Sequence, residues 1–511
     1  MDQPNKLTGV CFGDTLTIED LISVARFRSP VSFSGAYRER VNQSRALVEQ
    51  FVRENRLIYG VTTGVGDNVK RVIPEDEAAI YQEKMVLTHC TAVGEPLDEE
   101  GVRAIMFMML ANLGTGYTGI RLQVLELLSE FLNRGVFPWA PIHGSVGYLG
   151  VEAHIALVLM GKGKAFVNGT LTDGAAALKA AGLEPIRLGY KEGLCLISGG
   201  TAATALAALA EYGLLNALAA ADAVSAVTVE ALGGNMGAFD ERVMSVKKQA
   251  DQWKTADHLR GLLADSEILK KLGGQNLQDA LSLRCIPQAH GAARKTILDA
   301  RTAIENEINS CDDNPIIHPS GEALSACNAD AGFVGIASDS LCIAACYLAK
   351  IAERRTDRMV NELVSGLPAF LSPDPGGNSG YMILQYSSAG ILGEMRVLAH
   401  PASIDAIPTC ALQEDYVSMG YNAALKARET AGLLEYVIGN ELLAAAQALE
   451  LKAGAGVSPS RFGQRILKAV REKAPFMTED HYISPDMEWC RDLVSSGRVR
   501  EIAEDLIGTM D

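Results

Sequence analysis

The residues best suited to chemistry lie in segments rich in glycine. Tyr59 opens the loop Tyr59–Gly66, in which three glycines separated by β-branched residues exclude a regular helix. A loop of this kind can carry a functional side chain and can move, although the same composition also suits an ordinary surface turn. The loop alone therefore makes Tyr59 a candidate functional residue, and both interpretations stay open.

Standard catalytic signatures are missing from the sequence. Gly144-Ser145-Val146-Gly147 is not a nucleophile elbow, and there is no phosphate-binding loop, no GxGxxG motif that opens a helix after a strand, and no HExxH. The eight histidines have no metal-ligand spacing, so we expect no metal site. The chemistry must come from residues that no short motif brings together.

Composition limits the kind of protein that can position these residues. The chain has 511 residues, and 46 Lys and Arg against 62 Asp and Glu give a net charge of −16, which argues against a nucleic-acid partner. With 48% hydrophobic and 21% charged residues the chain can bury a large core and is not disordered. Few aromatic residues and abundant Gly and Ala favour closely packed helices.

The sequence also bears on the compartment. Met1–Lys6 lacks a basic segment followed by an apolar stretch, so we expect no secretory signal. Gly193–Ala210 carries no charge, but its Ser, Thr and Gly content and the following Glu211 favour a buried helix start over a membrane span. The ten cysteines are scattered without CxxC pairs, as in a reduced protein. We therefore expect a cytoplasmic protein with no membrane partner.

From about residue 100 onward the hydrophobic pattern is helical almost throughout. Several segments exceed 20 residues and are rich in alanine, which predicts a bundle that is buried on all sides and completed by other subunits. We expect an N-terminal region at 1–110 with the tyrosine loop and a histidine segment, a central long-helix bundle at 111–480 and a C-terminal helical tail at 481–511. The main predicted helices are 36–56, 101–113, 120–133, 200–233, 289–310, 332–365, 380–400, 415–452 and 460–472.

Several strings, in chain order, resemble the histidine and aromatic amino-acid ammonia-lyase family over roughly residues 55–475. The resemblance implies a mainly α fold: a fumarase/aspartase-like long-helix bundle with a smaller N-terminal mixed region. It also implies a homotetramer with shared active sites and a small-molecule substrate. The matching strings are Tyr59-Gly-Val-Thr-Thr-Gly-Val-Gly66, Leu87-Thr-His89-Cys-Thr-Ala-Val-Gly-Glu-Pro-Leu97, Gly144-Ser-Val-Gly147, Gln278-Asp-Ala-Leu-Ser-Leu-Arg284-Cys285, Asn306-Glu-Ile-Asn-Ser310, Asp313-Asn-Pro315, Asn378-Ser-Gly380, Leu398-Ala-His-Pro-Ala-Ser403 and Gln413-Glu414-Asp415.

The sequence departs from the family pattern at the electrophile. Family members follow Gly-Ser-Val-Gly with Ala-Ser-Gly, which cyclises into a methylidene-imidazolone, whereas here Gly147 is followed directly by Tyr148. Ser198–Gly200 replaces an Asn-Gly-Thr run, and Leu281 replaces a tyrosine, both associated with that electrophile in the family. Asn328–Asp330 replaces a frequent Asn-Phe-His. We therefore expect no methylidene-imidazolone and no other cofactor.

Without that electrophile the substrate must bring its own leaving group. A quaternary trimethylammonium departs as neutral trimethylamine, and the family branch known to lack the tripeptide is ergothionase. The resemblance thus implies a carbon–nitrogen lyase that eliminates trimethylamine from a histidine-type betaine, converting ergothioneine into thiourocanate, although an unthiolated betaine would also suit. Two alternatives stay open: a conventional histidine or aromatic amino-acid ammonia-lyase, and a non-catalytic tetrameric paralogue.

The resemblance assigns the main catalytic roles residue by residue. Tyr59 matches the base, and its pKa would have to fall by roughly two to three units from about 10 to work near pH 7. Arg284 matches the arginine that binds the substrate carboxylate, a role that suits the planar guanidinium. Glu414, beside Gln413, matches the position that contacts the imidazole ring. Each could instead be a structural hydrogen-bonding or ion-paired residue.

Other positions complete the predicted site. His89 matches a histidine near the ring end of the substrate, and Ser198 lies where the family has an asparagine. The face of Tyr148 could hold a quaternary ammonium by a cation–π contact. For these residues ordinary packing is a comparable alternative. Gln278 and Asn328 match the carboxylate side of the site, and Asp330 would add negative charge. For these three residues, too, ordinary packing is a comparable alternative.

Overall fold

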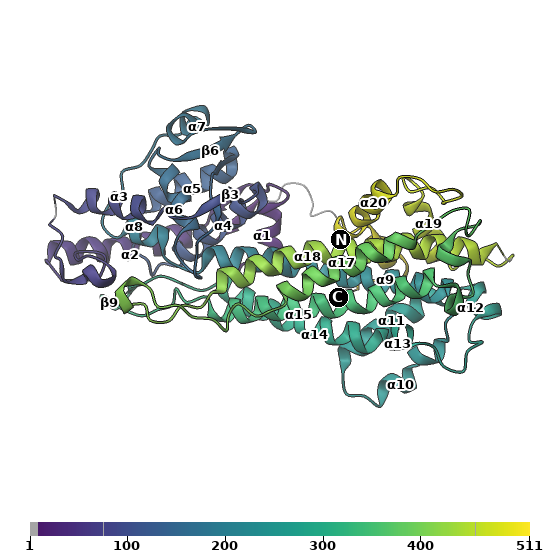
Figure 1. Ribbon diagram of the computed structural model, residues 1–511. Helices are drawn as coiled ribbons and strands as arrows, with labels where there is room; N and C mark the ends of the chain where they lie inside the picture. Colours follow the sequence, from purple (N-terminus) through teal and green to yellow (C-terminus); the bar gives the residue numbers. More distant parts are fainter. Residues whose placement is uncertain (1–8, 75, 455, 511) are drawn as a thin grey trace.

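Long helices run side by side through the middle of the molecule, a computed structural model that describes residues 9–74, 76–454 and 456–510 (Figure 1). Met1–Lys6, on which the expectation about a signal rests, lie outside the described residues. The mainly helical fold that the sequence predicts is confirmed. The bundle helices are α9 (Thr201–Ala231), α14 (Ile286–Ile308), α15 (Gly332–Val360), α17 (Met382–Leu398) and α18 (Gly420–Ala453).

Small side chains explain how these helices pack so closely. Helix α9 is rich in alanine and is buried along nearly its whole length, with α4, α14, α15 and α18 packed around it. A helix that is apolar on every face is stable only when neighbours cover all of it. The predicted bundle core is therefore present within the single chain.

The N-terminal part forms a lobe over one end of the bundle (Figure 1). Its short strands pair in parallel (β1 with β2) or antiparallel (β3 with β5, and β4–β6–β7), and β8 pairs with β9 at the near end of the bundle. The helices are α1 (Ile18–Ala25), α2 (Gly35–Arg53), α3 (Ala78–His89), α4 (Glu99–Leu113), α5 (Leu122–Arg134), α6 (Val151–Leu159), α7 (Gly174–Ala180) and α8 (Glu192–Ile197). The strands are β1 (Val10–Phe12), β2 (Val31–Phe33), β3 (Val93–Pro96), β4 (Val136–Pro138), β5 (Pro141–His143), β6 (Lys164–Val167), β7 (Thr170–Asp173), β8 (Ile316–His318) and β9 (Glu322–Leu324).

Shorter helices cover the far half of the bundle. The α-helices are α10 (Glu241–Ser245), α11 (Ala250–Leu263), α12 (Glu267–Leu272), α13 (Leu281–Arg284), α16 (Glu362–Ser365), α19 (Arg461–Val470), α20 (Ser484–Ser495) and α21 (Arg498–Ile507). The 3₁₀ turns are η1 (Gly66–Lys70), η2 (Met236–Phe239), η3 (Ala369–Leu371) and η4 (Cys410–Leu412). The predicted domain limits at 110 and 480 stay predictions.

Each of the long predicted helices is present, and the largest differences, five residues each, are at one end of two of them. The helix predicted over 332–365 stops at Val360, because Asn361 is extended and caps the separate helix α16. The helix predicted from 415 begins at Gly420, because Met419 has a left-handed backbone with φ 52°. Hydrophobic periodicity predicts where a helix lies, but it does not show a single residue whose backbone conformation ends the helix.

Two helical stretches are long and apolar enough to cross a membrane, Glu192–Ala231 and Gly332–Val360. Within the fold, 94% and 61% of their most apolar windows is buried, so both are core helices of the bundle. The expectation that Gly193–Ala210 is a buried helix start is confirmed.

A buried ionic cluster joins three of the helices. Asp222 of α9 lies 2.7 Å from Arg294 Nη2 and 2.7 Å from His290 Nδ1, both on α14, and 2.8 Å from His258 Nδ1 on α11. The Asp222, His290 and Arg294 side chains are fully buried. Burial raises the pKa of Asp222, but the charge of Arg294 and the two histidine hydrogen bonds outweigh it and hold that pKa far below its usual range.

Candidate active site

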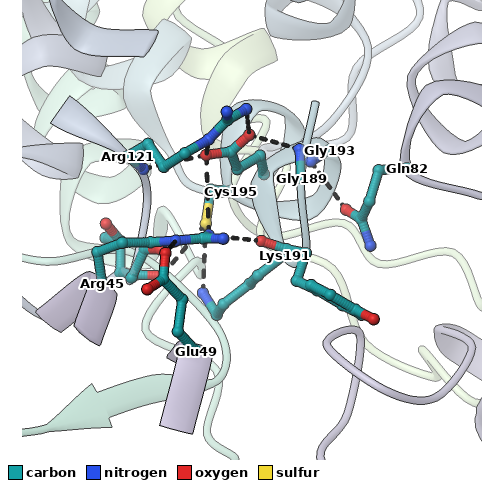
Figure 2. A network of polar contacts seen from close by, with 12 residues as sticks. Arg45, Glu49, Gln82, Arg121, Gly189, Lys191, Gly193 and Cys195 are labelled. Carbon is teal, nitrogen blue, oxygen red and sulfur yellow. Dashed lines mark hydrogen bonds and ion pairs between the residues drawn. The ribbon is translucent and has the colours of Figure 1, made fainter. Parts of the chain in front are cut away.

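The tyrosine loop is anchored to the start of α8. Gln82 Nε2 donates to the Gly60 carbonyl oxygen at 3.3 Å, and Gln82 Oε1 accepts from the Gly193 N–H at 2.8 Å (Figure 2). A Cβ atom at Gly60 would lie 2.3 Å from Leu194, so the loop can approach α8 only with glycine there. The segment that contains Tyr59 is therefore fixed against the segment that leads to Ser198.

The same network continues to the segment after α14. Lys191, fully buried and with a left-handed backbone, forms an ion pair with Asp313, and its Nζ lies 3.4 Å from Cys195 Sγ (Figure 2). Burial lowers the pKa of Lys191, but the charge of Asp313 outweighs it and raises the pKa above the usual value. The network therefore links the tyrosine loop, α8, which ends at Ser198, and the segment after α14.

Tyr59 has a backbone donor at its hydroxyl. Its Oη accepts from the Gly66 N–H at 2.8 Å, and this hydrogen bond lowers the pKa of the phenol. Burial acts in the opposite direction and is the larger cause, and the negative charge of Glu414 adds to it, so that the Tyr59 pKa is raised above 10. The lowered pKa that a base at Tyr59 would need is not produced by this chain alone.

Glu414 lies at the end of a strained turn. The Thr409 N–H donates to the Glu414 carbonyl oxygen at 2.7 Å, and the Glu414 N–H donates back at 3.4 Å. Between them Cys410, Ala411 and Leu412 all have left-handed backbones, with φ 51°, 53° and 70°. Left-handed conformations cost about 1–2 kcal/mol per non-glycine residue, and such strain collects at functional sites.

The turn also contacts the tyrosine loop. A Cβ atom at Gly66 would lie 2.7 Å from Cys410 Sγ, and η1 packs against η4. Gly66 itself has φ 58° and supplies the hydrogen bond to Tyr59. The loop with the predicted base and the turn with Glu414 are therefore packed directly on each other.

Tyr148 and Asp330 join this group. Burial raises the Tyr148 pKa, and the nearby negative charges of Glu414 and Asp330 raise it further. Cys327, three residues before Asp330, is under the electrostatic influence of the same two carboxylates. The structure thus brings together four of the predicted residues from four separate segments: Tyr59, Tyr148, Asp330 and Glu414.

Ser198 and its glycines lie where two helices begin. Gly199 has φ 104°, and a Cβ atom at Gly200, which precedes α9, would lie 3.1 Å from the Ala331 Cβ, which precedes α15. Ser198 itself ends α8, and its N–H donates to Leu194 at 2.9 Å. The positive ends of two long helices therefore meet beside Ser198.

Carboxyl groups near these helix starts are poorly solvated. Asp312 is 1% exposed, and burial with the charge of Glu307 raises its pKa well above the usual range. Burial and the charge of Asp330 raise the pKa of Glu307 to about 7. This side of the site is therefore acidic but holds part of its protons at neutral pH.

The remaining predicted residues make other contacts. Arg284 ends α13, far along the bundle from α2 and α3 (Figure 1), and its Nε donates to the Asp279 carbonyl at 3.1 Å. Gln278 is exposed in the segment just before it. His89 ends α3, with Nδ1 2.7 Å from the Met85 carbonyl oxygen. Asn328 and Gln413 are exposed near the Glu414 group, and Asn328 Nδ2 donates to Cys311 at 3.3 Å.

Two positions in the site were not anticipated. Thr409 holds Glu414, and its own sequence context carries no motif that points to this role. Gly66 belongs to the predicted tyrosine loop, but no pattern in the sequence indicates that its N–H donates to Tyr59. Within the described part of the chain, no group of three or more His, Cys, Asp or Glu side chains is arranged to hold a metal ion.

Comparisons with known proteins agree with this fold. The family model for aromatic amino acid lyases matches residues 16–472. A histidine ammonia-lyase of Caldanaerobacter subterraneus subsp. tengcongensis is 42% identical over 497 residues, which cover 96% of this chain and 97% of that protein. The structure of histidine ammonia-lyase from Trypanosoma cruzi has a TM-score of 0.90 and 32% identity, and the match covers 96% of this chain and 94% of that one. Tyrosine aminomutase from Streptomyces globisporus has a TM-score of 0.93 and 31% identity, with 98% and 99% covered.

These similarities contradict the predicted trimethylamine elimination from ergothioneine. Ergothionase from Treponema denticola matches the fold with a TM-score of 0.90 and covers 96% of this chain, but it is only 27% identical. Relatives at about 40% identity over nearly the full length are histidine ammonia-lyases. The prediction gave one short loop more weight than the similarity of the whole chain, and it is wrong.

The predicted absence of the methylidene-imidazolone is contradicted as well, because histidine ammonia-lyases use this group and form it autocatalytically. The residues of the corresponding loop nevertheless do not fit its usual precursor. Gly147 is bonded to Tyr148 without an Ala-Ser-Gly run, and burial with the charge of Glu414 raises the pKa of the Tyr148 phenol. Family membership and the sequence of this loop therefore disagree about the group.

Proposed function

The chain belongs to the aromatic amino acid lyase family and is a carbon–nitrogen lyase, and from this premise we propose that it eliminates ammonia from L-histidine to give the conjugated acid urocanate. The observation that carries the proposal is Glu414, a carboxylate packed beside Tyr59. A carboxylate there can accept a hydrogen bond from an imidazole N–H, which a phenyl ring cannot donate. We place the enzyme in the cytoplasm as part of this proposal.

Each side chain then has a defined task. The Tyr59 phenolate takes a proton from the β-carbon, and the amine leaves the neighbouring α-carbon as the double bond forms. Glu414 holds the ring, with His89 and Gln413 at the ring end of the substrate. Arg284 binds the carboxylate, with three polar residues lining that side: Gln278, Asn328 and Ser198. Tyr148 orients Glu414, and Asp330 makes the amine side negative.

A second part of the proposal is a homotetramer whose sites combine residues of several subunits. Arg284 lies on α13, away from Tyr59 in the same chain, so a neighbouring copy must supply it. Exposed apolar side chains on the bundle give such copies a surface to bury: Phe333 (77% exposed) and Ile336 (65%) on α15 and Val397 (76%) on α17. A guanidinium from a neighbour would also lower the Tyr59 pKa, which the single chain leaves raised.

The function is tested by incubating the purified chain with L-histidine and with L-phenylalanine, and by measuring ammonia and the near-ultraviolet absorbance of the conjugated acid. We expect product from histidine at a far higher kcat/KM. Product from phenylalanine alone, or from neither, would overturn the proposal. Intact mass, compared with the mass that the sequence gives, reports separately on the autocatalytic group, whose formation removes water from the chain.

A mixing experiment tests the shared site. Tyr59→Phe and Arg284→Ala should each be nearly inactive, because one lacks the base and the other the carboxylate clamp. After the two are dissociated and reassembled together, hybrid tetramers contain some sites in which both wild-type residues meet, so activity should return to a measurable fraction of the wild-type value. If hybrid tetramers of verified composition stay inactive, Tyr59 and Arg284 of each site belong to the same chain.

A further inference from the structure

Thr409 controls how Glu414 is held. Its side-chain Oγ1 donates to Glu414 Oε2 at 3.2 Å, while its backbone pairs with the backbone of Glu414 in both directions. Thr409 therefore holds Glu414 at both its backbone and its carboxylate.

Fixing the carboxylate matters because its hydrogen bonds are directional. An ionised carboxylate can accept about four hydrogen bonds, so the Thr409 hydroxyl leaves capacity for a donor on a substrate. This donor also removes rotational freedom at the end of a flexible side chain, which otherwise would be lost when the substrate binds. A site built to accept a ring N–H also rejects a ring that lacks one, because the carboxylate is then left without that donor.

The turn that carries Thr409 cannot shift freely to compensate. Leu412 N–H donates to the Thr409 carbonyl at 3.0 Å, and Gln413 N–H donates to Cys410 at 3.0 Å, which closes the left-handed turn. Cys410 Sγ lies against Gly66 of the tyrosine loop. A change in the position of Glu414 would therefore require the packing beside Tyr59 to change as well.

We propose that Thr409 is a specificity-determining positioning residue, whose hydroxyl holds Glu414 in the orientation that accepts a hydrogen bond from the N–H of an azole ring. The enzyme thereby selects substrates with such a ring over substrates with a carbocyclic aromatic ring. This inference rests on the proposed function and names the residue that sets its ring preference. Thr409 acts through Glu414 and does not itself contact the substrate.

The test separates ring recognition from turnover by measuring binding. Imidazolepropionate and phenylpropionate, which lack the amine, are titrated into the assembled wild-type enzyme, Thr409→Val, Thr409→Ser and the control Thr302→Val by calorimetry. Thr302 is exposed and its hydroxyl bonds only within its own helix, to Leu298 at 3.2 Å. We expect Thr409→Val to weaken imidazolepropionate binding about 10- to 100-fold and to leave phenylpropionate binding unchanged, because a hydrogen bond to a charged group is lost from the support of Glu414.

The other variants decide between positioning and a general structural role. Thr409→Ser should retain most of the affinity for imidazolepropionate, and kcat/KM for histidine should fall in Thr409→Val but not in Thr302→Val. Equal loss for both ligands, equal behaviour of Thr409→Val and Thr302→Val, or no imidazolepropionate binding by the wild type would overturn the inference. If the wild type shows the expected ring preference in binding but releases no ammonia from histidine, the proposed function fails while the role of Thr409 stands.

Discussion

Tyr59→Phe is expected to lower kcat/KM for histidine by about 10²–10⁴-fold, because general-base catalysis contributes a factor of that size. The variant keeps the ring that packs in the loop and loses only the oxygen that accepts from Gly66. Binding of imidazolepropionate should change little, since Glu414 and its hydrogen bond from Thr409 remain. The loss should therefore appear in kcat, measured as ammonia release at saturating histidine.

The pH profile of the wild type gives an independent check. The active form of a base is the deprotonated one, so activity rises with pH through the pKa of Tyr59. In the single chain this pKa lies above 10, because burial and the charge of Glu414 outweigh the Gly66 hydrogen bond. Each cation that a neighbouring subunit brings close lowers this pKa and so shifts the rise in activity toward neutral pH. The matched control is Tyr436→Phe, whose hydroxyl bonds to Glu488 at the surface at 2.9 Å. Full activity in Tyr59→Phe would remove Tyr59 from the role of base.

The long helices could be predicted from the sequence because their signal is repeated many times. In Thr201–Ala231 and Gly332–Val360 the small and apolar residues recur over several turns, so one exceptional residue does not hide the pattern. The tyrosine loop was also recognisable, since three glycines in eight residues cannot continue a helix. The local geometry at Gly66, in contrast, depends on Cys410, which lies far away in sequence.

The turn at Thr409 shows why part of the site could not be predicted. Cys410, Ala411 and Leu412 are residue types that ordinarily avoid a left-handed backbone, so propensity argues against the conformation that the fold imposes. Tertiary contacts stabilise it, and the hydroxyl of Thr409 reaches Glu414 only because of it. The position of Arg284 could not be predicted for a similar reason. Its residue type suits carboxylate binding, but its distance from Tyr59 depends on the path of the bundle helices.

The error about the reaction came from a different source. Three residues are missing after Gly147, and the predicted reaction rests on this gap and on a few substitutions elsewhere in the site, such as Leu281. Similarity to histidine ammonia-lyases extends over nearly the whole chain and includes the elements that hold Glu414 and Tyr59. A short deletion changes what one loop can do, whereas the ring-binding side of the pocket depends on residues spread over the fold.

Asp222→Asn should destabilise the protein more than a surface substitution can, by about 3–5 kcal/mol, because it leaves the Arg294 guanidinium buried without its carboxylate. The amide has the same size, so packing in the bundle is retained. The folded pKa of Asp222 lies below the unfolded value of about 4, so the stabilisation is complete above that value and is lost as pH falls through the folded pKa. The difference between wild type and variant should therefore be constant from mildly acidic to neutral pH, measured as urea midpoints at one protein concentration.

The matched control is Asp299→Asn, because Asp299 forms an ion pair with Lys295 in which the two side chains are 65% and 57% exposed. Removing that pair should change stability by less than about 1 kcal/mol. Adding Arg294→Met to Asp222→Asn should recover much of the loss, since the unpaired charge is then gone and an apolar chain of similar length fills the space. The histidine hydrogen bonds to Asp222 are weakened equally in Asp222→Asn and in the double variant. If the double variant is no more stable than Asp222→Asn, the loss of stability therefore arises from those bonds and not from the unpaired guanidinium.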